Sequence, residues 1–145
     1  MDAEIGYKLL MEAVGTGNSD FLMGLLDNVT LVSQKQGIVD AKTMNYILAV
    51  VRGIEPKDQM EAMLASQMAA IQMATMQAAT LMLARNNIDQ REKCERSFNR
   101  LARTFAAQME ALKRYRSKGE QRVYVERVNV EQGGQARVAD FTSVQ

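Results

Sequence analysis

Basic residues recur every three or four positions in the second half of the chain. Eight of them are close enough to act together: Lys93, Arg96, Arg100, Arg103, Lys113, Arg114, Arg116 and Lys118. The first four are separated by three, four and three positions, which places them on one face of a helix. Ammonium and guanidinium groups in such a row can contact DNA phosphates, so all eight are candidate DNA-binding residues. A solvated helix face is the other interpretation of this row.

The residue types that most catalytic and metal-binding chemistry requires are missing. The chain has no histidine and one cysteine, Cys94. This excludes Ser-His-Asp and Cys-His nucleophile systems, and zinc sites built from histidines or from several thiolates. The segment Gly15-Thr16-Gly17 fits the end of a helix better than a phosphate-binding loop. We expect a protein that is not an enzyme and has no metal or cofactor.

The charge is distributed unevenly. The 145 residues carry a formal net charge of only +1, which gives no general electrostatic case for nucleic-acid binding. Residues 91–122, however, hold ten Lys/Arg and four Asp/Glu, a net charge of +6, and the rest of the chain carries −5. Any contact with DNA is therefore expected from this segment.

The sequence also bears on the compartment. The first residues, MDAEIGYKLL, lack the basic and apolar parts of a secretory signal. A single cysteine excludes an internal disulfide and suits a reducing environment. We expect a cytoplasmic protein.

The first part of the chain, residues 1–55, is predicted to be an N-terminal helical domain. Its helices are expected at residues 3–14, 21–36 and 41–53, with the second capped by Asn18-Ser19-Asp20. Three short helices could also form a helix-turn-helix. Residues 1–57 carry five basic and seven acidic side chains and no basic recognition helix, which favours a packing domain.

A long apolar helix is predicted next, opened by Pro56 at its first turn. Of the 25 residues 60–84, 18 are apolar, six are methionine and only Glu61 is charged. A helix that is apolar nearly all round must be covered on more than one side. A membrane span is the alternative, but the three glutamines, the many alanines and the missing aromatic anchors argue against it. We expect a helix wedged between neighbours, with no membrane contact.

The following helix, about residues 90–117, is predicted to start at a capping box of Asp89 and Glu92. Its apolar positions recur at spacings of 4, 3, 4, 4 and 3: Cys94, Phe98, Leu101, Phe105, Met109 and Leu112. This one-sided pattern predicts an antiparallel helical hairpin with the preceding helix, over residues 56–118. Cys94 lies on the apolar side, as a small buried hydrophobe rather than a reactive thiol.

The last segment, residues 119–145, reads as a β-hairpin and a tail. Tyr124, Val128 and Val130 belong to a β-branched and aromatic run, and Gly133-Gly134 provides a turn. An isolated two-stranded ribbon is marginal in water, and the sequence before it reads as helix without a strand to join. We therefore expect the hairpins of several copies to pair and close a shared barrel.

The predicted fold class is mainly α: short N-terminal helices, a long central antiparallel helical hairpin, a C-terminal β-hairpin and a ring-like homo-oligomer. The apolar helix, the apolar side of the following helix and the terminal hairpin supply the expected contacts between copies. These candidate oligomerisation residues are Met60, Met63, Leu64, Met68, Ile71, Phe98, Leu101, Phe105, Tyr124, Val128 and Val130.

This order of elements resembles that of phage small terminase subunits. The resemblance implies a ring that recognises viral DNA and regulates the large terminase motor. If the chain is encoded by a phage, its cytoplasm is that of the host. The segments RGIEPKDQMEAMLASQMAA, LARTFAAQMEALKRYRSKGEQRV and VNVEQGGQARV resemble a family of short bacterial proteins without an assigned function. We therefore expect a non-enzymatic, oligomeric DNA-packaging adaptor whose partners are further copies, double-stranded DNA and a large terminase subunit. The alternative is a structural or regulatory assembly protein that binds a protein partner through the methionine-rich helix, without DNA.

Overall fold

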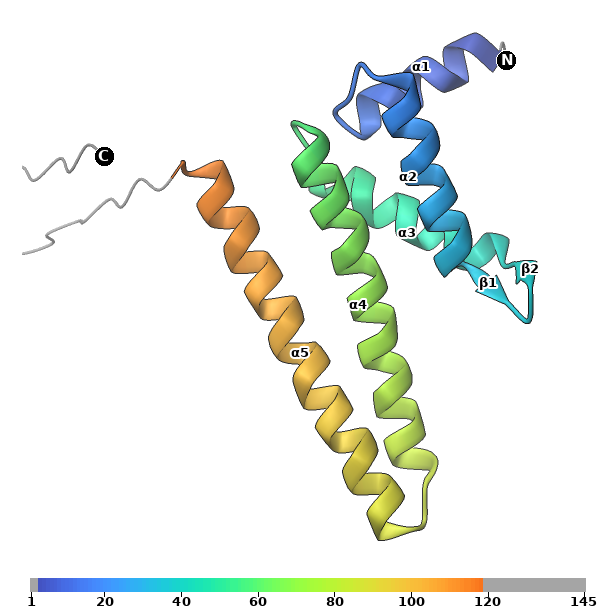
Figure 1. Ribbon diagram of the computed structural model, residues 1–145, viewed down its shortest axis with the longest axis vertical. Helices are drawn as coiled ribbons and strands as arrows, with labels where there is room; N and C mark the ends of the chain where they lie inside the picture. The colour runs from blue at the N-terminus through green and yellow to red at the C-terminus, as the bar shows by residue number, and fades with distance from the viewer. Residues whose placement is uncertain (1–2, 119–145) are drawn as a thin grey trace, which may run out of the picture.

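The computed structural model describes residues 3–118, which form five helices and one two-stranded antiparallel sheet. In chain order the elements are α1 (Ala3–Ala13), α2 (Ser19–Val32), β1 (Gln34–Lys35), β2 (Ile38–Val39), α3 (Ala41–Ile54), α4 (Gln59–Ala84) and α5 (Ile88–Arg116). Helices α4 and α5 lie side by side and antiparallel, and α1–α3 gather at the N-terminal half of α4 (Figure 1). The mainly helical class and the central helical hairpin are confirmed. The predicted β-hairpin of residues 119–145, with Tyr124, Val128 and Val130, lies outside the described residues, and the ring stays a prediction.

A small β-hairpin between α2 and α3 corrects the prediction of continuous helix to residue 36. Helix α2 ends at Val32, and Gln34 and Lys35 pair with Val39 and Ile38. The two residues between the strands, Gln36 and Gly37, have φ values of +54° and +79°. Two consecutive residues at positive φ form the tight turn that joins antiparallel strands. The expectation that the chain holds no strand before residue 119 was therefore wrong.

Two helix starts also differ from the sequence prediction. Helix α4 begins at Gln59 rather than at Pro56, because the carboxylate of Asp58 caps it by accepting a hydrogen bond from the Glu61 backbone N–H at 2.9 Å. Helix α5 is capped by Asn87, whose Oδ1 accepts from the Gln90 N–H at 3.2 Å, rather than by the Asp89 capping box. The predicted Asn18 cap of α2 is confirmed: its Oδ1 accepts from the Phe21 N–H at 2.9 Å.

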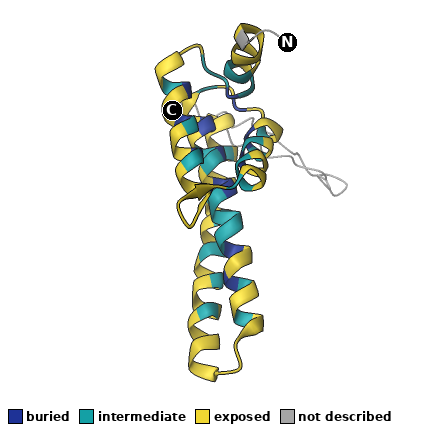
Figure 2. Cartoon of the chain, turned by 90° about the vertical axis from the view of Figure 1, so that its right-hand side faces the viewer, coloured by how far each residue is buried: buried dark blue, intermediate teal, exposed yellow. Residues whose placement is uncertain are grey.

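The core lies where α2 and α3 meet the first half of α4. Its buried apolar residues are Val14, Leu22, Leu25, Val29, Ile47, Val51, Ala62, Ala65 and Ala69. Helix α4 contributes only alanines to this cluster, and side chains this small let two helices approach it closely. Figure 2 shows buried positions concentrated in this region and mostly exposed positions toward the α4–α5 turn. The far half of the helical hairpin therefore projects beyond the core.

Gly15 lies in the loop after α1 and packs closely against the backbone of Pro56, in the corner that precedes α4. Its φ is +64°, and a Cβ added there would lie 2.2 Å from the carbonyl oxygen of Pro56. We expect Gly15→Ala to lower the free energy of unfolding by about 1–2 kcal/mol, because alanine is strained at this φ and the backbones must separate. Gly17→Ala is the matched control, since nothing lies within 4 Å of its added Cβ. Urea denaturation of both variants tests this, and equal stabilities would contradict the close approach.

Candidate functional site

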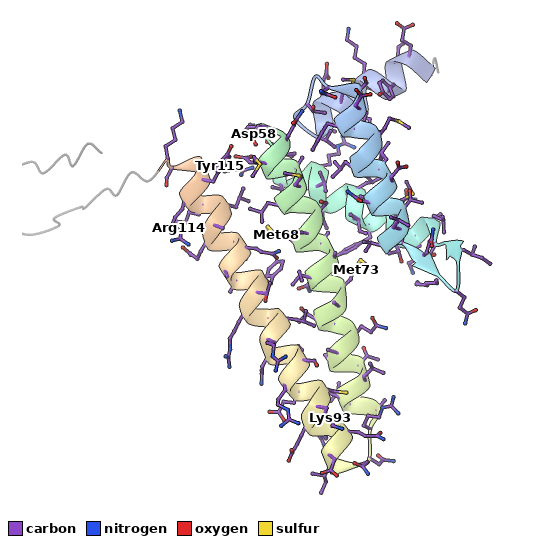
Figure 3. The ribbon with its side chains drawn as sticks, in the orientation of Figure 1. Asp58, Met68, Met73, Lys93, Arg114 and Tyr115 are labelled. Carbon is purple, nitrogen blue, oxygen red and sulfur yellow. The ribbon has the colours of Figure 1, made fainter. Side chains whose placement is uncertain are left out.

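Five basic residues form a row along the outer side of α5, opposite the side that packs on α4. We call Lys93, Arg96, Arg100, Arg103 and Arg114 the α5 ridge; all five side chains are exposed. The helical repeat places the ridge away from the half-buried Phe98, Leu101 and Phe105, which face α4. Arg114 points away from α4 in Figure 3. The hairpin thus buries its apolar side internally and presents the ridge to solvent.

The ridge cations have no ionic partner within residues 3–118, where the ion pairs are Lys35–Asp40 and Arg116–Glu61. Acidic residues nevertheless lie one turn away from some of them. Glu92 precedes Arg96 by four positions, and Glu110 precedes Arg114 by four. Arg100 and Arg103 have no acidic residue three or four positions away on either side. The positive charge of the ridge is therefore least compensated at its centre.

The other three candidate DNA-binding residues lie near the end of α5 but off the ridge. Lys113 is exposed on a flank of the helix, and Lys118 is exposed just beyond the C-cap Ser117. Cations in this last turn also interact favourably with the helix dipole. Arg116 is different, because its guanidinium is bound within the chain. Within residues 3–118, seven of the eight predicted residues therefore carry exposed cations without an ion pair, and Arg116 does not.

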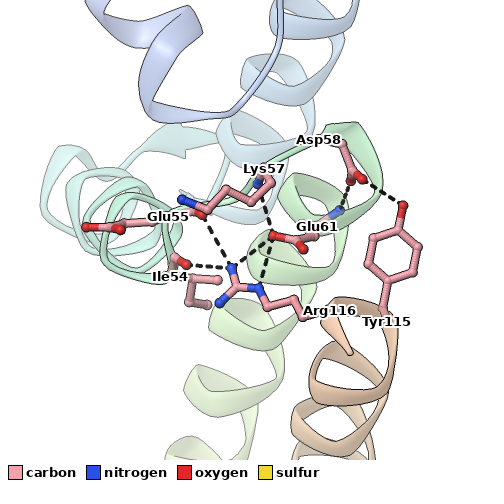
Figure 4. Close-up of polar contacts among 7 residues, drawn as sticks. All are labelled: Ile54, Glu55, Lys57, Asp58, Glu61, Tyr115 and Arg116. Carbon is pink, nitrogen blue, oxygen red and sulfur yellow. Dashed lines mark hydrogen bonds and ion pairs between the residues drawn. The ribbon is translucent and has the colours of Figure 1, made fainter. Parts of the chain in front are cut away.

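Arg116 joins three parts of the fold. Its Nη2 and Nε donate to Glu61 Oε2 at 2.9 and 3.2 Å, and Nη2 also donates to the Ile54 carbonyl oxygen at 2.7 Å and to that of Glu55 at 3.3 Å (Figure 4). These carbonyls end α3, where helix geometry leaves them without an internal partner. Arg116 therefore fixes the end of α5 to the corner between α3 and α4.

Glu61 and Asp58 complete this polar cluster from the first turn of α4. The Glu61 side chain is only 4% exposed and also accepts from the Lys57 backbone N–H at 2.9 Å. The hydroxyl of Tyr115 donates to Asp58 Oδ2 at 2.7 Å (Figure 4). We call Asp58, Glu61, Tyr115 and Arg116 the corner cluster. Sequence reasoning missed it because its partners lie more than 50 positions apart.

The hydrogen bonds of the corner cluster shift the pKa values of its members. The Arg116 guanidinium lowers the pKa of the Glu61 carboxyl, against the opposing effect of burial. The Glu61 backbone N–H, and then the Tyr115 hydroxyl, lower the pKa of Asp58. In return, the hydrogen bond to Asp58 raises the pKa of Tyr115. Both carboxyls are thus held in their charged forms, Glu61 by its ion pair with Arg116 and Asp58 by its hydrogen bonds.

Helix α4 has three different sides along its length. One side packs on α2 and α3 through its alanines, and a second packs on α5. By helical position the second side holds Leu64, Met68 and Ile71; Met68 is 6% exposed and points toward α5 (Figure 3). Three of the predicted oligomerisation residues therefore lie inside the chain's own hairpin, together with Phe98, Leu101 and Phe105.

The third side of α4 is open to solvent. Its positions recur at spacings of 3, 4, 3, 4, 3, 4 and 3, and we call this row the α4 seam: Met60, Met63, Gln67, Ala70, Ala74, Gln77, Leu81 and Ala84. Met60 remains 58% exposed, and Met63, Gln67, Gln77, Leu81 and Ala84 are also exposed. Of the predicted oligomerisation residues in α4, only Met60 and Met63 lie on this open side.

Two shallow grooves border the α4 seam at its N-terminal half. One groove lies toward α2 and includes Leu31 and Val32, and the other lies toward the end of α5 and includes Ala111 and Tyr115. Met63 and Gln67 line both grooves. The open surface is therefore wider than one helix, and its lining is apolar with few charges.

Other kinds of site find little support in the described part of the chain. Cys94 is free and half-buried on the α4-facing side of α5. Within residues 3–118 no group of three or more Cys, Asp or Glu side chains gathers as a metal ion would require. In the same range, no helix is both long and apolar enough for a bilayer crossing.

Comparisons of the chain with protein-family models, with curated proteins and with solved structures find no match. The geometry of the α5 ridge and of the α4 seam is therefore what bears on function.

Proposed function

We propose that this protein is a non-enzymatic homo-oligomeric adaptor that binds double-stranded DNA through the α5 ridge. In this proposal the helical hairpin assembles copies of the chain and presents their ridges together. The packaging role, in which the adaptor regulates a large terminase motor, comes from the resemblance in element order to phage small terminase subunits.

The observation that carries the proposal is the unpaired state of the α5 ridge. Its five cations are exposed on one side of a single helix and form no ion pair within residues 3–118. From Lys93 to Arg103 the helix rises about 15 Å, and from Lys93 to Arg114 about 32 Å. Along duplex DNA, each strand presents a phosphate about every 3.4 Å. A ridge of this length can therefore follow several consecutive phosphates.

The ridge favours contacts with phosphates over the reading of base sequence. All five members carry cations that bind phosphates, although an arginine can also contact guanine in the major groove. Phosphate contacts position a protein on DNA but carry no sequence information. We therefore expect affinity that depends strongly on salt and weakly on DNA sequence.

A second candidate function is an assembly protein that binds a protein partner and no DNA. It is favoured by the four acidic residues that share α5 with the ridge: Asp89, Glu92, Glu95 and Glu110. They reduce the positive potential of the helix and would be repelled by phosphates. The two functions differ in whether the ridge arginines affect DNA affinity.

The test of the proposal is a triple variant, Arg96→Gln, Arg100→Gln and Arg103→Gln, at low salt. We expect its affinity for a short DNA duplex to fall by about 10- to 100-fold at 50 mM salt, because three phosphate contacts are lost. Fluorescence anisotropy with labelled duplex gives the affinity. Light scattering should show the same particle mass as the parent, since the ridge faces away from the helix contacts.

The matched control removes the same charge elsewhere: Lys8→Gln, Lys42→Gln and Lys57→Gln. All three lysines are exposed and lie outside α5. We expect the DNA affinity of this control to lie within about threefold of the parent's, because binding depends on the ridge cations and not on the net charge of the chain. Equal losses of DNA affinity in both triple variants would show that the effect comes from the change in net charge and not from the ridge. A parent that binds no DNA at 50 mM salt would sink the proposal and favour the second candidate.

A further inference from the structure

The α4 seam is the most unusual uncovered surface of the described chain. It runs the full length of a 26-residue helix, about 36 Å from Met60 to Ala84, and it has no charged residue. Spacings that alternate between 3 and 4 are those of a helix that packs along a second helix. Here neither α5 nor the N-terminal helices provide that second helix, because they occupy the other two sides of α4.

The chemistry of the seam restricts what can cover it. A covering helix needs an uncharged contact row, since burying an unpaired cation or carboxylate against methionine and alanine is costly. The α5 ridge of another copy is therefore unsuitable. The covering helix also needs small residues near its middle, where Ala70 and Ala74 leave room for close approach. A second α4 meets both requirements.

We propose that the α4 seam pairs with the α4 seam of a second copy, antiparallel and about a two-fold axis near Gln72. In this register the seam is complementary to itself. Met60 meets Ala84, Met63 meets Leu81, Gln67 meets Gln77, and Ala70 meets Ala74, with each pair symmetric about Gln72. Large residues thus face smaller or flexible ones, and the two alanines meet at the centre.

The glutamines fix the register of this pair. Gln67 Oε1 accepts a long hydrogen bond of 3.5 Å from Gln108 Nε2, and the Gln67 amide nitrogen has no partner within residues 3–118. In the symmetric register it meets the Gln77 amide of the other copy, which can accept from it. A register shifted by one heptad would place Gln67 against Ala70 or Ala84, and each amide buried without a partner costs about 1–3 kcal/mol.

The inference deepens the homo-oligomer part of the proposed function and is independent of DNA binding. A two-fold contact uses the same surface of both copies and by itself gives a dimer. Larger assemblies then need a second contact, for which residues 119–145 are the predicted source. In the paired state the α5 ridges lie on the outer sides of the two hairpins, where they remain free.

Cysteine cross-linking in a Cys94→Ser background tests the arrangement directly. Chains with Gln67→Cys and chains with Gln77→Cys are mixed, refolded together and oxidised. We expect a disulfide-linked dimer in the mixture and little in either variant alone, because position 67 meets position 77 of the other copy. Asn99→Cys mixed with Ala107→Cys, two exposed positions on α5, is the matched control and should not cross-link.

A mass measurement complements the cross-linking. Ala74→Glu places two carboxylates near the two-fold axis, and we expect it to halve the native mass or to reduce it to the 16.2 kDa monomer. Ala107→Glu, an exposed alanine on α5, should leave the mass unchanged. Circular dichroism checks that both variants keep their helix content.

Three outcomes would overturn the two-fold pair. Cross-linking of Gln67→Cys with itself would show a parallel pair or an antiparallel pair centred on position 67. An unchanged mass for Ala74→Glu would place the oligomer contact elsewhere. A parent that is a folded monomer, together with a Gln67→Cys variant whose new thiol reacts slowly, would assign the seam to the chain's own residues 119–145. Loss of DNA binding with intact cross-linking would count against the proposed function alone.

Discussion

Arg116→Ala is expected to lower the free energy of unfolding by about 2–3 kcal/mol at neutral pH. The substitution leaves the buried Glu61 carboxylate without its cation and removes the donor from the Ile54 carbonyl oxygen. Removing one partner of a buried ion pair costs about 3–5 kcal/mol. The Arg116 side chain is still 38% exposed, so water screens the pair and the smaller value is expected here. Urea denaturation measures the difference.

Arg114→Ala is the matched control for this prediction. Arg114 lies two residues earlier on the same helix, is exposed and forms no ion pair within residues 3–118. Its replacement should change the free energy of unfolding by no more than about 0.5 kcal/mol. Equal effects of the two substitutions would show that the corner cluster does not hold the helices together.

The pH dependence gives the same prediction a second readout. Arg116 holds the pKa of Glu61 below its ordinary value of 4.5. The stability from this pair is therefore fully present above about pH 4.5 and is lost as the pH falls through the lowered pKa. The difference between the parent and Arg116→Ala should be largest at neutral pH and should shrink in strong acid. A difference that is constant from pH 7 to pH 3 would contradict the ion pair.

Leu22→Ala is expected to destabilise the protein by about 3 kcal/mol. The Leu22 side chain is fully buried among α2, α3 and the alanines of α4, so its truncation leaves a cavity that rigid helices cannot close. Met23→Ala, at the next and 51% exposed position, should cost less than 1 kcal/mol. Thermal denaturation followed by circular dichroism compares the two. Equal losses would contradict the docking of α2 on α4.

The helices of this chain are readable from its sequence because they depend on local patterns. The periodic apolar residues of α5 predict both the helix and the side that packs on α4. The β-hairpin at residues 34–39 was not predicted, since its four strand residues are exposed and give no apolar alternation. The Gln36-Gly37 pair was the available signal, because a glycine next to a polar residue is typical of a two-residue turn.

The candidate site is only partly readable in the same way. The spacing of Lys93, Arg96, Arg100 and Arg103 predicts a common helix face, and the structure places them on one. The binding of Arg116 to Glu61 depends on tertiary packing between positions 55 residues apart, for which no local pattern exists. In α4, nearly every position is apolar, so periodicity could not separate Met68, which faces α5, from Met63, which faces solvent.

The salt dependence of DNA binding tests the central claim most directly. If the five ridge cations each neutralise a phosphate, the logarithm of the affinity should fall with the logarithm of salt concentration with a slope of about −4.5. Between 50 and 200 mM salt this is a loss of about 500-fold. The triple variant of Arg96, Arg100 and Arg103 should retain a slope of about −2. A parent slope near zero, or the same slope in parent and triple variant, would contradict DNA binding through the α5 ridge.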